Sequence, residues 1–220
     1  MKLKEFEDIL KRGNYEEIKP YLRTEVRNKA NLHTKVYYQE IIGDIVRVVV
    51  AHTMLDDGRE VTGLLTPVTI NVLGVTPATL LCDAKDNTPC NFKVNTLNSI
   101  VKNITQDIDT QPDGYPLESI DTLIQSDNLL ESTLVVNIDT NTRVSILQFP
   151  KLLRSIYSKI GDYYIIPSSV YEVMIIPSNK VEDIDSMNEL IRTVNTTVVS
   201  DNDALSNRLL KYNALGLSEC

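Results

Sequence analysis

The segment from Tyr163 to Pro177 constrains the fold of this 220-residue chain more than any other part of the sequence. Two short apolar runs, 163–166 and 173–176, are each followed by a proline and flank the polar residues Ser-Ser-Val-Tyr-Glu. Short apolar runs bounded by turn-forming residues are typical of neighbouring strands. The preceding segment, 149–160, has its apolar residues at helical spacing, and Gly161 follows it. The sequence therefore predicts a helix and then an antiparallel strand pair.

The N-terminal half begins with helical spacing and then changes to a strand-like composition. Residues 3–12 predict a helix, and a second helix is predicted from Tyr15 to about Asn28, limited by Pro20. Residues 36–55 are rich in β-branched and aromatic side chains, so we expect a strand there, with a break or bulge at Gly43-Asp44. The turn residues 56–60 then predict a returning strand over 61–65.

Two Thr-Pro pairs, at positions 66–67 and 76–77, predict the starts of short helices, because threonine caps a helix and proline suits its first turn. The helices are expected over 68–73 and 78–85. Residues 86–115 are weakly patterned and polar, which predicts a strand or short helix among loops and a joint between two halves of the chain.

The C-terminal half predicts further helices and strands. A helix is expected over 116–126, and a hairpin over 133–138 and 143–147. A helix over 183–194 is expected to bury Ile184, Met187, Leu190, Ile191 and Val194. The tail, 205–217, predicts a short helix or a final edge strand.

The order of these elements predicts an α+β fold in which antiparallel sheets pack against helices. The pattern leaves open a division into two small subdomains. Three segments are expected: a helical segment over 1–35, a strand hairpin with short helices over 36–115, and an α+β half over 116–220.

Composition excludes several classes of protein. No apolar stretch approaches the roughly 20 residues of a membrane span, and the first eight residues lack the apolar core of a signal peptide. The three cysteines, Cys82, Cys90 and Cys220, do not form a Cys-x-x-Cys pair, so free thiols are expected. We therefore expect a cytoplasmic protein without a membrane partner.

The charge is unevenly distributed along the chain. Residues 1–35 carry nine Lys/Arg against six Asp/Glu, whereas the remainder carries 13 against 24. Residues 103–142 contain eight acids and no Lys or Arg. One interpretation is a solvated surface; the other is a recognition face for a basic protein, formed by Asp107, Asp109, Asp113, Glu118, Asp121 and Asp127. Direct nucleic-acid binding is not expected, because the net charge is −8.

Catalytic candidates are weak. The spacing of Ser169 and Glu172 is that of a capping box, in which each side chain bonds the other residue's backbone N–H. A structural turn explains the pattern, and a nucleophile at Ser168 or Ser169, or a general base at Glu172, is the alternative. His52, at the end of an apolar strand, is expected to be a hydrogen-bonded structural histidine.

Metal and cofactor signals are sparse. Two histidines without His-x-x-x-His or Cys-x-x-Cys spacing predict no metal site. No glycine-rich phosphate loop occurs, so no cofactor is expected. Tyr163, Tyr164 and Tyr171 are candidate binding residues because tyrosine combines a large ring with a polar tip, although half-buried strand positions explain them equally well.

Two segments, 65–89 and 149–195, carry a family resemblance. The first includes Leu-Gly-Val-Thr at positions 73–76, and the second includes Tyr-Ile-Ile-Pro-Ser-Ser at 164–169. Together they resemble a family of uncharacterised proteins, a domain of unknown function common in gut Firmicutes and their mobile elements. Leu73 stands where that family usually has an aromatic residue, and Tyr171 where histidine is common. The resemblance implies a fold and a genomic setting, and no mechanism.

The leading functional hypothesis is a non-enzymatic interaction protein of a bacterial mobile element or phage. It would bind a protein with a basic surface, for example as an antagonist of a host defence system. The alternatives are an enzyme acting on a small molecule or nucleotide with an acidic general base, and a structural or assembly subunit. The sequence leaves the oligomeric state open.

Overall fold

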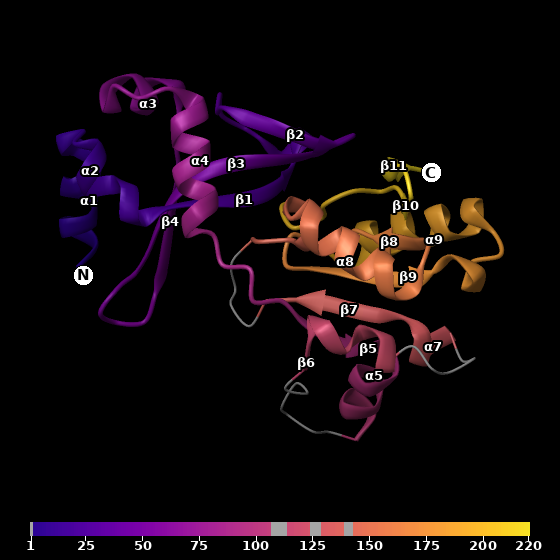
Figure 1. Cartoon of the computed structure of the whole chain (residues 1–220). Coiled ribbons are helices and arrows are strands. Elements are labelled where there is room, and N and C mark those ends of the chain that lie inside the picture. The colour runs from indigo at the N-terminus through magenta and orange to yellow at the C-terminus, as the bar shows by residue number, and fades with distance from the viewer. Residues whose placement is uncertain (1, 107–113, 124–128, 139–142) are drawn as a thin grey trace.

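The computed structural model describes residues 2–106, 114–123, 129–138 and 143–220, which form two antiparallel sheets with helices packed on them (Figure 1). Sheet A has four strands and comes from the N-terminal part of the chain. Sheet B has seven strands, in the order β11-β10-β8-β9-β7-β5-β6. The α+β prediction, with antiparallel sheets against helices, is therefore confirmed.

Sheet A is built around β3 (Ile45–Met54), whose valine-rich sequence suits a strand buried on both faces. β1 (Leu22–Asn28) pairs with one edge of β3, while β2 (Tyr38–Ile42) and β4 (Glu60–Leu64) pair with successive parts of the other edge. Gly43, with φ of 53°, makes the turn between β2 and β3 at the predicted break.

β1 corrects the predicted second helix. Helix α2 (Tyr15–Ile18) ends before Pro20, and after a single 3₁₀ turn (Lys19–Tyr21) the chain becomes a strand. In β1, Leu22, Thr24 and Val26 alternate into the interior, which is the period of a strand. The pairing with β3 is the tertiary contact that decides against the helix.

Three helices cover one face of sheet A. They are α1 (Leu3–Arg12), α3 (Pro67–Leu73) and α4 (Pro77–Asn87), and their buried residues share one hydrophobic cluster with Leu22, Val49 and Ala51 of the sheet. Thr66 and Thr76 cap α3 and α4 as predicted, each accepting a hydrogen bond from the backbone N–H three residues later. At the end of α4, the buried Thr88 hydroxyl accepts the Thr24 backbone N–H at 2.8 Å and joins the helix to β1.

Sheet B combines strands that are far apart in sequence. They are β5 (Lys93–Thr96), β6 (Tyr115–Pro116), β7 (Leu134–Asn137), β8 (Tyr163–Ile166), β9 (Glu172–Pro177), β10 (Leu210–Asn213) and β11 (Gly216–Glu219). β8 and β9 form the predicted antiparallel pair. Of the two alternatives for the tail, a short helix or a final edge strand, the structure has strands: β10 and then β11 at the edge of the sheet. Since β5 begins at Lys93, sheet B starts inside the predicted segment 36–115; the three-segment division itself stays a prediction.

The hairpin predicted over 133–147 is wrong. β7 pairs with β5 and β9, while residues 143–145 form no strand and Ile146–Gln148 form a 3₁₀ turn. The proposed turn at 139–142 lies outside the described residues. The predicted helix over 116–126 is, in its described part, a 3₁₀ turn followed by α6 (Ile120–Leu123). α5 (Leu97–Thr105) and α7 (Leu129–Ser132) lie beside β5 (Figure 1).

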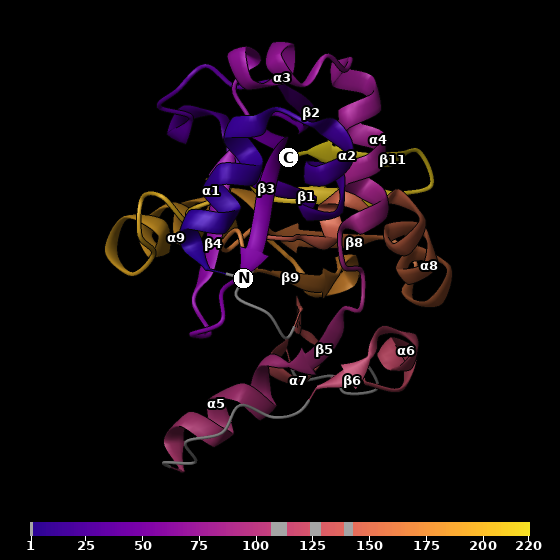
Figure 2. The ribbon, with the colours of Figure 1, turned by 90° about the vertical axis from the view of Figure 1, so that its left-hand side faces the viewer.

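Two helices lie on opposite faces of sheet B (Figure 2). α8 (Pro150–Ile160), which ends at Gly161 as predicted, contacts Tyr163, while α9 (Ile184–Thr197) packs Ile191 near Tyr164. The prediction that Ile184, Leu190 and Val194 are buried is wrong. Asn188 and Asn195 share the buried face with Ile191 instead, because their amides bond the backbone of the segment 206–209.

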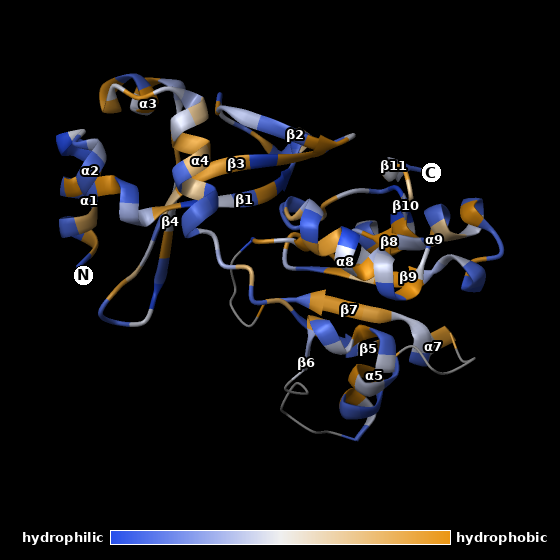
Figure 3. Ribbon diagram, viewed as in Figure 1, coloured by the Kyte–Doolittle hydropathy of each residue, from blue (hydrophilic) through white to orange (hydrophobic). Residues whose placement is uncertain are grey.

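The larger hydrophobic core spans both sheets. It contains Val26 and Ile45 from sheet A together with most inward residues of sheet B. Figure 3 shows hydrophobic residues concentrated along β3 and β7, with polar residues on the outer helices. Within the described ranges, no single helix is long and apolar enough to cross a membrane; only α3 and α4 taken together, bent by 92°, reach that length and composition.

Candidate functional site

The polar turn between β8 and β9 is held by its serines. The Ser169 hydroxyl accepts the backbone N–H groups of Tyr171 (3.2 Å) and Glu172 (3.3 Å), and the Ser168 hydroxyl donates to the Glu172 carbonyl oxygen (3.2 Å). The predicted capping box is only half formed. The Ser169 N–H donates to the Glu172 backbone oxygen at 3.2 Å, because Glu172 begins a strand rather than a helix. This geometry favours a structural turn over a serine nucleophile.

The hydrogen bonds of the turn between β8 and β9 predict how substitutions there change the stability of the protein. Ser169→Ala should lower the free energy of unfolding by about 1 kcal/mol, because two backbone N–H groups lose their acceptor. Glu172→Gln should be mild, since burial already raises the pKa of this carboxyl and so disfavours its charge. Urea denaturation of both variants tests this. A Glu172→Gln variant that loses a measured activity at unchanged stability would favour the enzyme hypothesis instead.

The three candidate tyrosines lie in different environments. Tyr163 is 0% exposed, donates its hydroxyl hydrogen to the Leu153 carbonyl oxygen at 2.9 Å and stacks on Tyr212 with ring centroids 5.3 Å apart. Tyr164 is 7% exposed and lies beneath the Lys211 ammonium. Both are packed in the core, which favours the interpretation as strand residues; their binding role stays a prediction. Tyr171 is half-buried, with the Arg143 guanidinium 5.5 Å above its ring.

The acidic recognition face is described only in part. Asp107, Asp109, Asp113 and Asp127 lie outside the described residues. Glu118 and Asp121 are exposed, and Lys159 bonds both the Glu118 carbonyl oxygen and the Asp121 carboxylate. The pairing with Lys159 lowers the pKa of Asp121. The recognition role stays a prediction.

His52 is not the hydrogen-bonded residue that we predicted. Its side chain is buried, and neither ring nitrogen has a hydrogen-bond partner within the described residues. The nearest carboxylate oxygen, on Glu60, lies 3.9 Å from Nε2, which is too long for a hydrogen bond. Burial, followed by repulsion from Arg23, lowers the pKa of His52 below its ordinary 6.5, while Glu60 opposes this.

The depressed pKa of His52 predicts a pH effect on stability. As pH falls through 6.5, the unfolded chain takes up a proton that the folded chain resists, so this histidine should lower stability increasingly until pH reaches its folded pKa. His52→Gln should remove that contribution. The difference in unfolding free energy between wild type and variant, measured from pH 7.5 to 5, should therefore change with pH. A constant difference would contradict the prediction.

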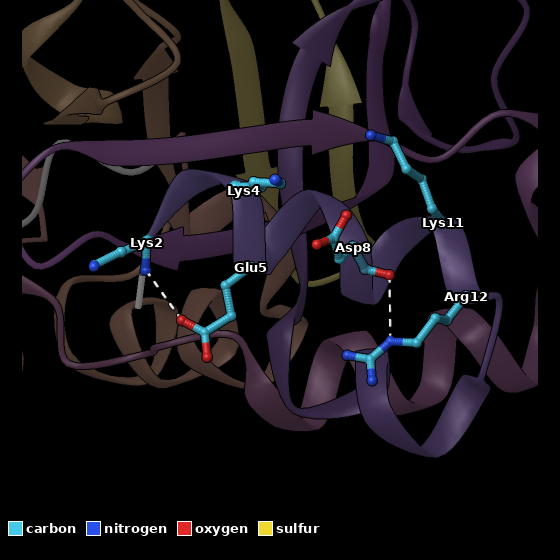
Figure 4. A pocket seen from close by; sticks show the side chains of 6 residues that line it. All are labelled: Lys2, Lys4, Glu5, Asp8, Lys11 and Arg12. Atoms are coloured by element: carbon cyan, nitrogen blue, oxygen red, sulfur yellow. Dashed lines mark hydrogen bonds between the residues drawn. The ribbon is translucent and has the colours of Figure 1, made fainter.

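The exposed face of α1 forms a broad hollow of about 760 Å³, drawn in Figure 4. All six residues that line it belong to α1 or its cap, and all are exposed. Figure 4 shows the Lys2 backbone N–H bonding Glu5 and the Arg12 guanidinium bonding the Asp8 carbonyl oxygen, both within the same helix. A hollow formed by exposed side chains of one helix, with no opposite wall, does not define a binding site.

A second pocket, of about 650 Å³, lies where sheet A meets the start of α8. Its walls come from β2, β3, the end of α4, Cys90, the 3₁₀ turn at 146–148 and the first residues of α8. This volume is within the range of small-molecule sites, roughly 300–1,000 Å³. The pocket therefore has the opposing walls that the α1 hollow lacks.

Arg47 is the most buried charged residue that lines this pocket. It is 7% exposed and donates to three neutral acceptors: Gln148 Oε1 (3.1 Å), the Gln148 carbonyl oxygen (2.6 Å) and Gln39 Oε1 (2.7 Å). It has no ion pair with an acidic side chain among the described residues. Burial alone lowers the pKa of its guanidinium, which nevertheless stays charged at neutral pH. A buried charge without a counter-charge is costly unless an anion binds it.

Two exposed lysines line the same pocket as Arg47. Lys85 and Lys151 line the pocket, and burial followed by repulsion from Arg47 lowers the pKa of Lys85. Arg47 has only donors, so the amide oxygen of Gln148 must face it, and the amide nitrogen points elsewhere. That buried Nε2 has no partner within the described residues. The arrangement is suited to hold an anion.

Sequence reasoning missed this pocket. One signal was present: Arg47 interrupts the run Val46-Arg47-Val48-Val49-Val50, and a charge in the middle of a buried strand needs a partner. The other residues come from segments separated by up to about a hundred positions. No group of three or more potential metal-ligating side chains occurs among the described residues.

Comparison with known proteins gives one match. A family model described as a family of unknown function (DUF5688) matches residues 4–214. No curated protein and no solved structure matches the sequence.

Proposed function

This chain belongs to the family of unknown function DUF5688, and we propose that it is a binding protein that holds an anionic ligand in the pocket around Arg47. The observation that carries the proposal is a buried guanidinium bonded only to neutral acceptors. An anion between Arg47 and Lys85 would compensate the buried charge and relieve the repulsion between the two cations. No nucleophile or base is needed for this role.

Ligand-dependent stabilisation tests the proposal. The chain has no tryptophan, so we would follow unfolding by scanning calorimetry. Phosphate, sulfate, citrate and acetate would be compared with chloride at constant ionic strength. A ligand at 100 times its Kd should add about 2.7 kcal/mol of stability. The double variant Lys85→Gln, Lys151→Gln should lose this response. Lys4→Gln, an exposed lysine of α1 outside the pocket, is the matched control. No response to any anion, or an equal response in the double variant, would overturn the proposal.

A second proposal comes from the acidic stretch: a non-enzymatic interaction protein of a bacterial mobile element or phage that binds a basic protein, for example to block host defence. The exposure of Glu118 and Asp121 supports it. After capture of a partner, Glu118→Gln with Asp121→Asn should slow association at low salt more than it speeds dissociation. Unchanged association rates would leave these residues as a solvated surface.

A further inference from the structure

We infer that the ligand of the Arg47 pocket is a phosphomonoester joined to an apolar or aromatic body. The inference rests on the proposed function, since it names the class of anion that the same pocket takes. Three properties of the pocket carry it: the number of positive charges, the number of unused donors, and an apolar wall beside them.

The positive charge exceeds what one carboxylate would balance. Arg47, Lys85 and Lys151 line the pocket, and Glu40 is the one acidic residue lining it within the described part of the chain. The Glu40 carboxylate already bonds the Lys29 ammonium at 2.9 Å. A carboxylate or a phosphodiester brings one negative charge, whereas a phosphomonoester brings about 1.5 to 2 at neutral pH. The charge therefore favours the monoester.

The donors also exceed those that a carboxylate needs. A guanidinium has five N–H groups, and Arg47 uses three of them on Gln39 and Gln148, which leaves two. The ammonium groups of Lys85 and Lys151 add more. The three terminal oxygens of a phosphomonoester accept more of these bonds than the two oxygens of a carboxylate.

The remaining wall is apolar. Ile41, Leu147, Phe149 and Leu152 line the pocket beside the cations. Phe149 is held by an edge-to-face contact with Phe92, at a centroid distance of 5.4 Å, and Ile41, Phe149 and Leu152 are only partly buried. If a free inorganic anion bound, this apolar wall would stay in contact with water. An apolar or aromatic body attached to the anion would cover the wall, which is favourable.

Three probes with the same ring separate the possible anions. Phenyl phosphate, methyl phenyl phosphate and benzoate would be titrated calorimetrically into the full chain at pH 7.5. Phenyl phosphate should bind at least about tenfold more tightly than either singly charged probe. Inorganic phosphate should bind more weakly than phenyl phosphate, because it lacks the ring. Lys85→Gln or Lys151→Gln should reduce the preference for the monoester, while Lys4→Gln should retain it.

The outcomes show whether only the ligand class is wrong or whether the anion pocket itself is wrong. If benzoate or the diester binds as tightly as phenyl phosphate, the ligand class is wrong and the anion pocket stands. The same conclusion holds if phenyl phosphate fails to bind while another anion stabilises the protein through Lys85 and Lys151. If neither these probes nor the simple anions bind, the proposed function itself is overturned.

Discussion

Arg47→Met should weaken anion binding by roughly tenfold to a hundredfold, while the ligand-free protein stays within about 2 kcal/mol of wild-type stability. The binding loss follows because Arg47 is the most buried of the three cations that line the pocket. The small effect on stability follows from two opposing terms. Removing a buried cation without a counter-ion is favourable, whereas leaving the Gln148 oxygens without their donor is unfavourable.

The measurement pairs calorimetric titration of phenyl phosphate with urea denaturation of the ligand-free chain. Arg59→Met is the matched control. Arg59 lies in the exposed turn between β3 and β4 and pairs with Asp57 there, so this variant makes the same change of charge outside the pocket. Wild-type affinity in Arg47→Met would rule out a role for the guanidinium in binding. A strong loss of stability without ligand would identify Arg47 as a structural residue.

The predictable parts of the fold are those that local sequence determines. β3, β4, α3, α4 and α8 have periodic apolar residues together with caps or turns at their ends, and the strand pair β8–β9 adds proline boundaries. β1 was included in the predicted helix over 15–28, whereas its strand conformation depends on pairing with β3, more than 15 positions away. Residues 143–147 do not form the expected hairpin because β7 has better-matched partners in β5 and β9.

The candidate sites also differ in how far the local sequence determines them. The Ser-Glu turn was located from its own five residues, and only its hydrogen-bond pattern differs, since Glu172 starts a strand. The Arg47 pocket joins β3, the end of α4 and the start of α8, which periodicity and spacing do not bring together. Local patterns predict turns and caps, whereas a pocket between packed elements depends on the tertiary arrangement.

Tyr163→Ala should lower the free energy of unfolding by about 3–5 kcal/mol, a large part of the roughly 5–15 kcal/mol that stabilises a typical domain. The ring is fully buried between α8 and Tyr212, so truncation removes its apolar contacts and leaves a cavity. Tyr163→Phe should cost only about 1 kcal/mol, because it keeps the ring and loses the bond to the Leu153 carbonyl oxygen.

Urea denaturation followed by circular dichroism measures both variants, with Tyr115→Ala as the control. Tyr115 is 55% exposed on the edge strand β6, so its truncation should change stability by less than about 0.5 kcal/mol. The experiment also decides between the two interpretations of the tyrosines. Truncating a tyrosine on a recognition surface would weaken partner binding while the free energy of unfolding stays nearly unchanged. Truncating a core tyrosine lowers the free energy of unfolding even without a partner. A cost for Tyr163→Ala as small as that of the control would contradict the packing of β8 against α8.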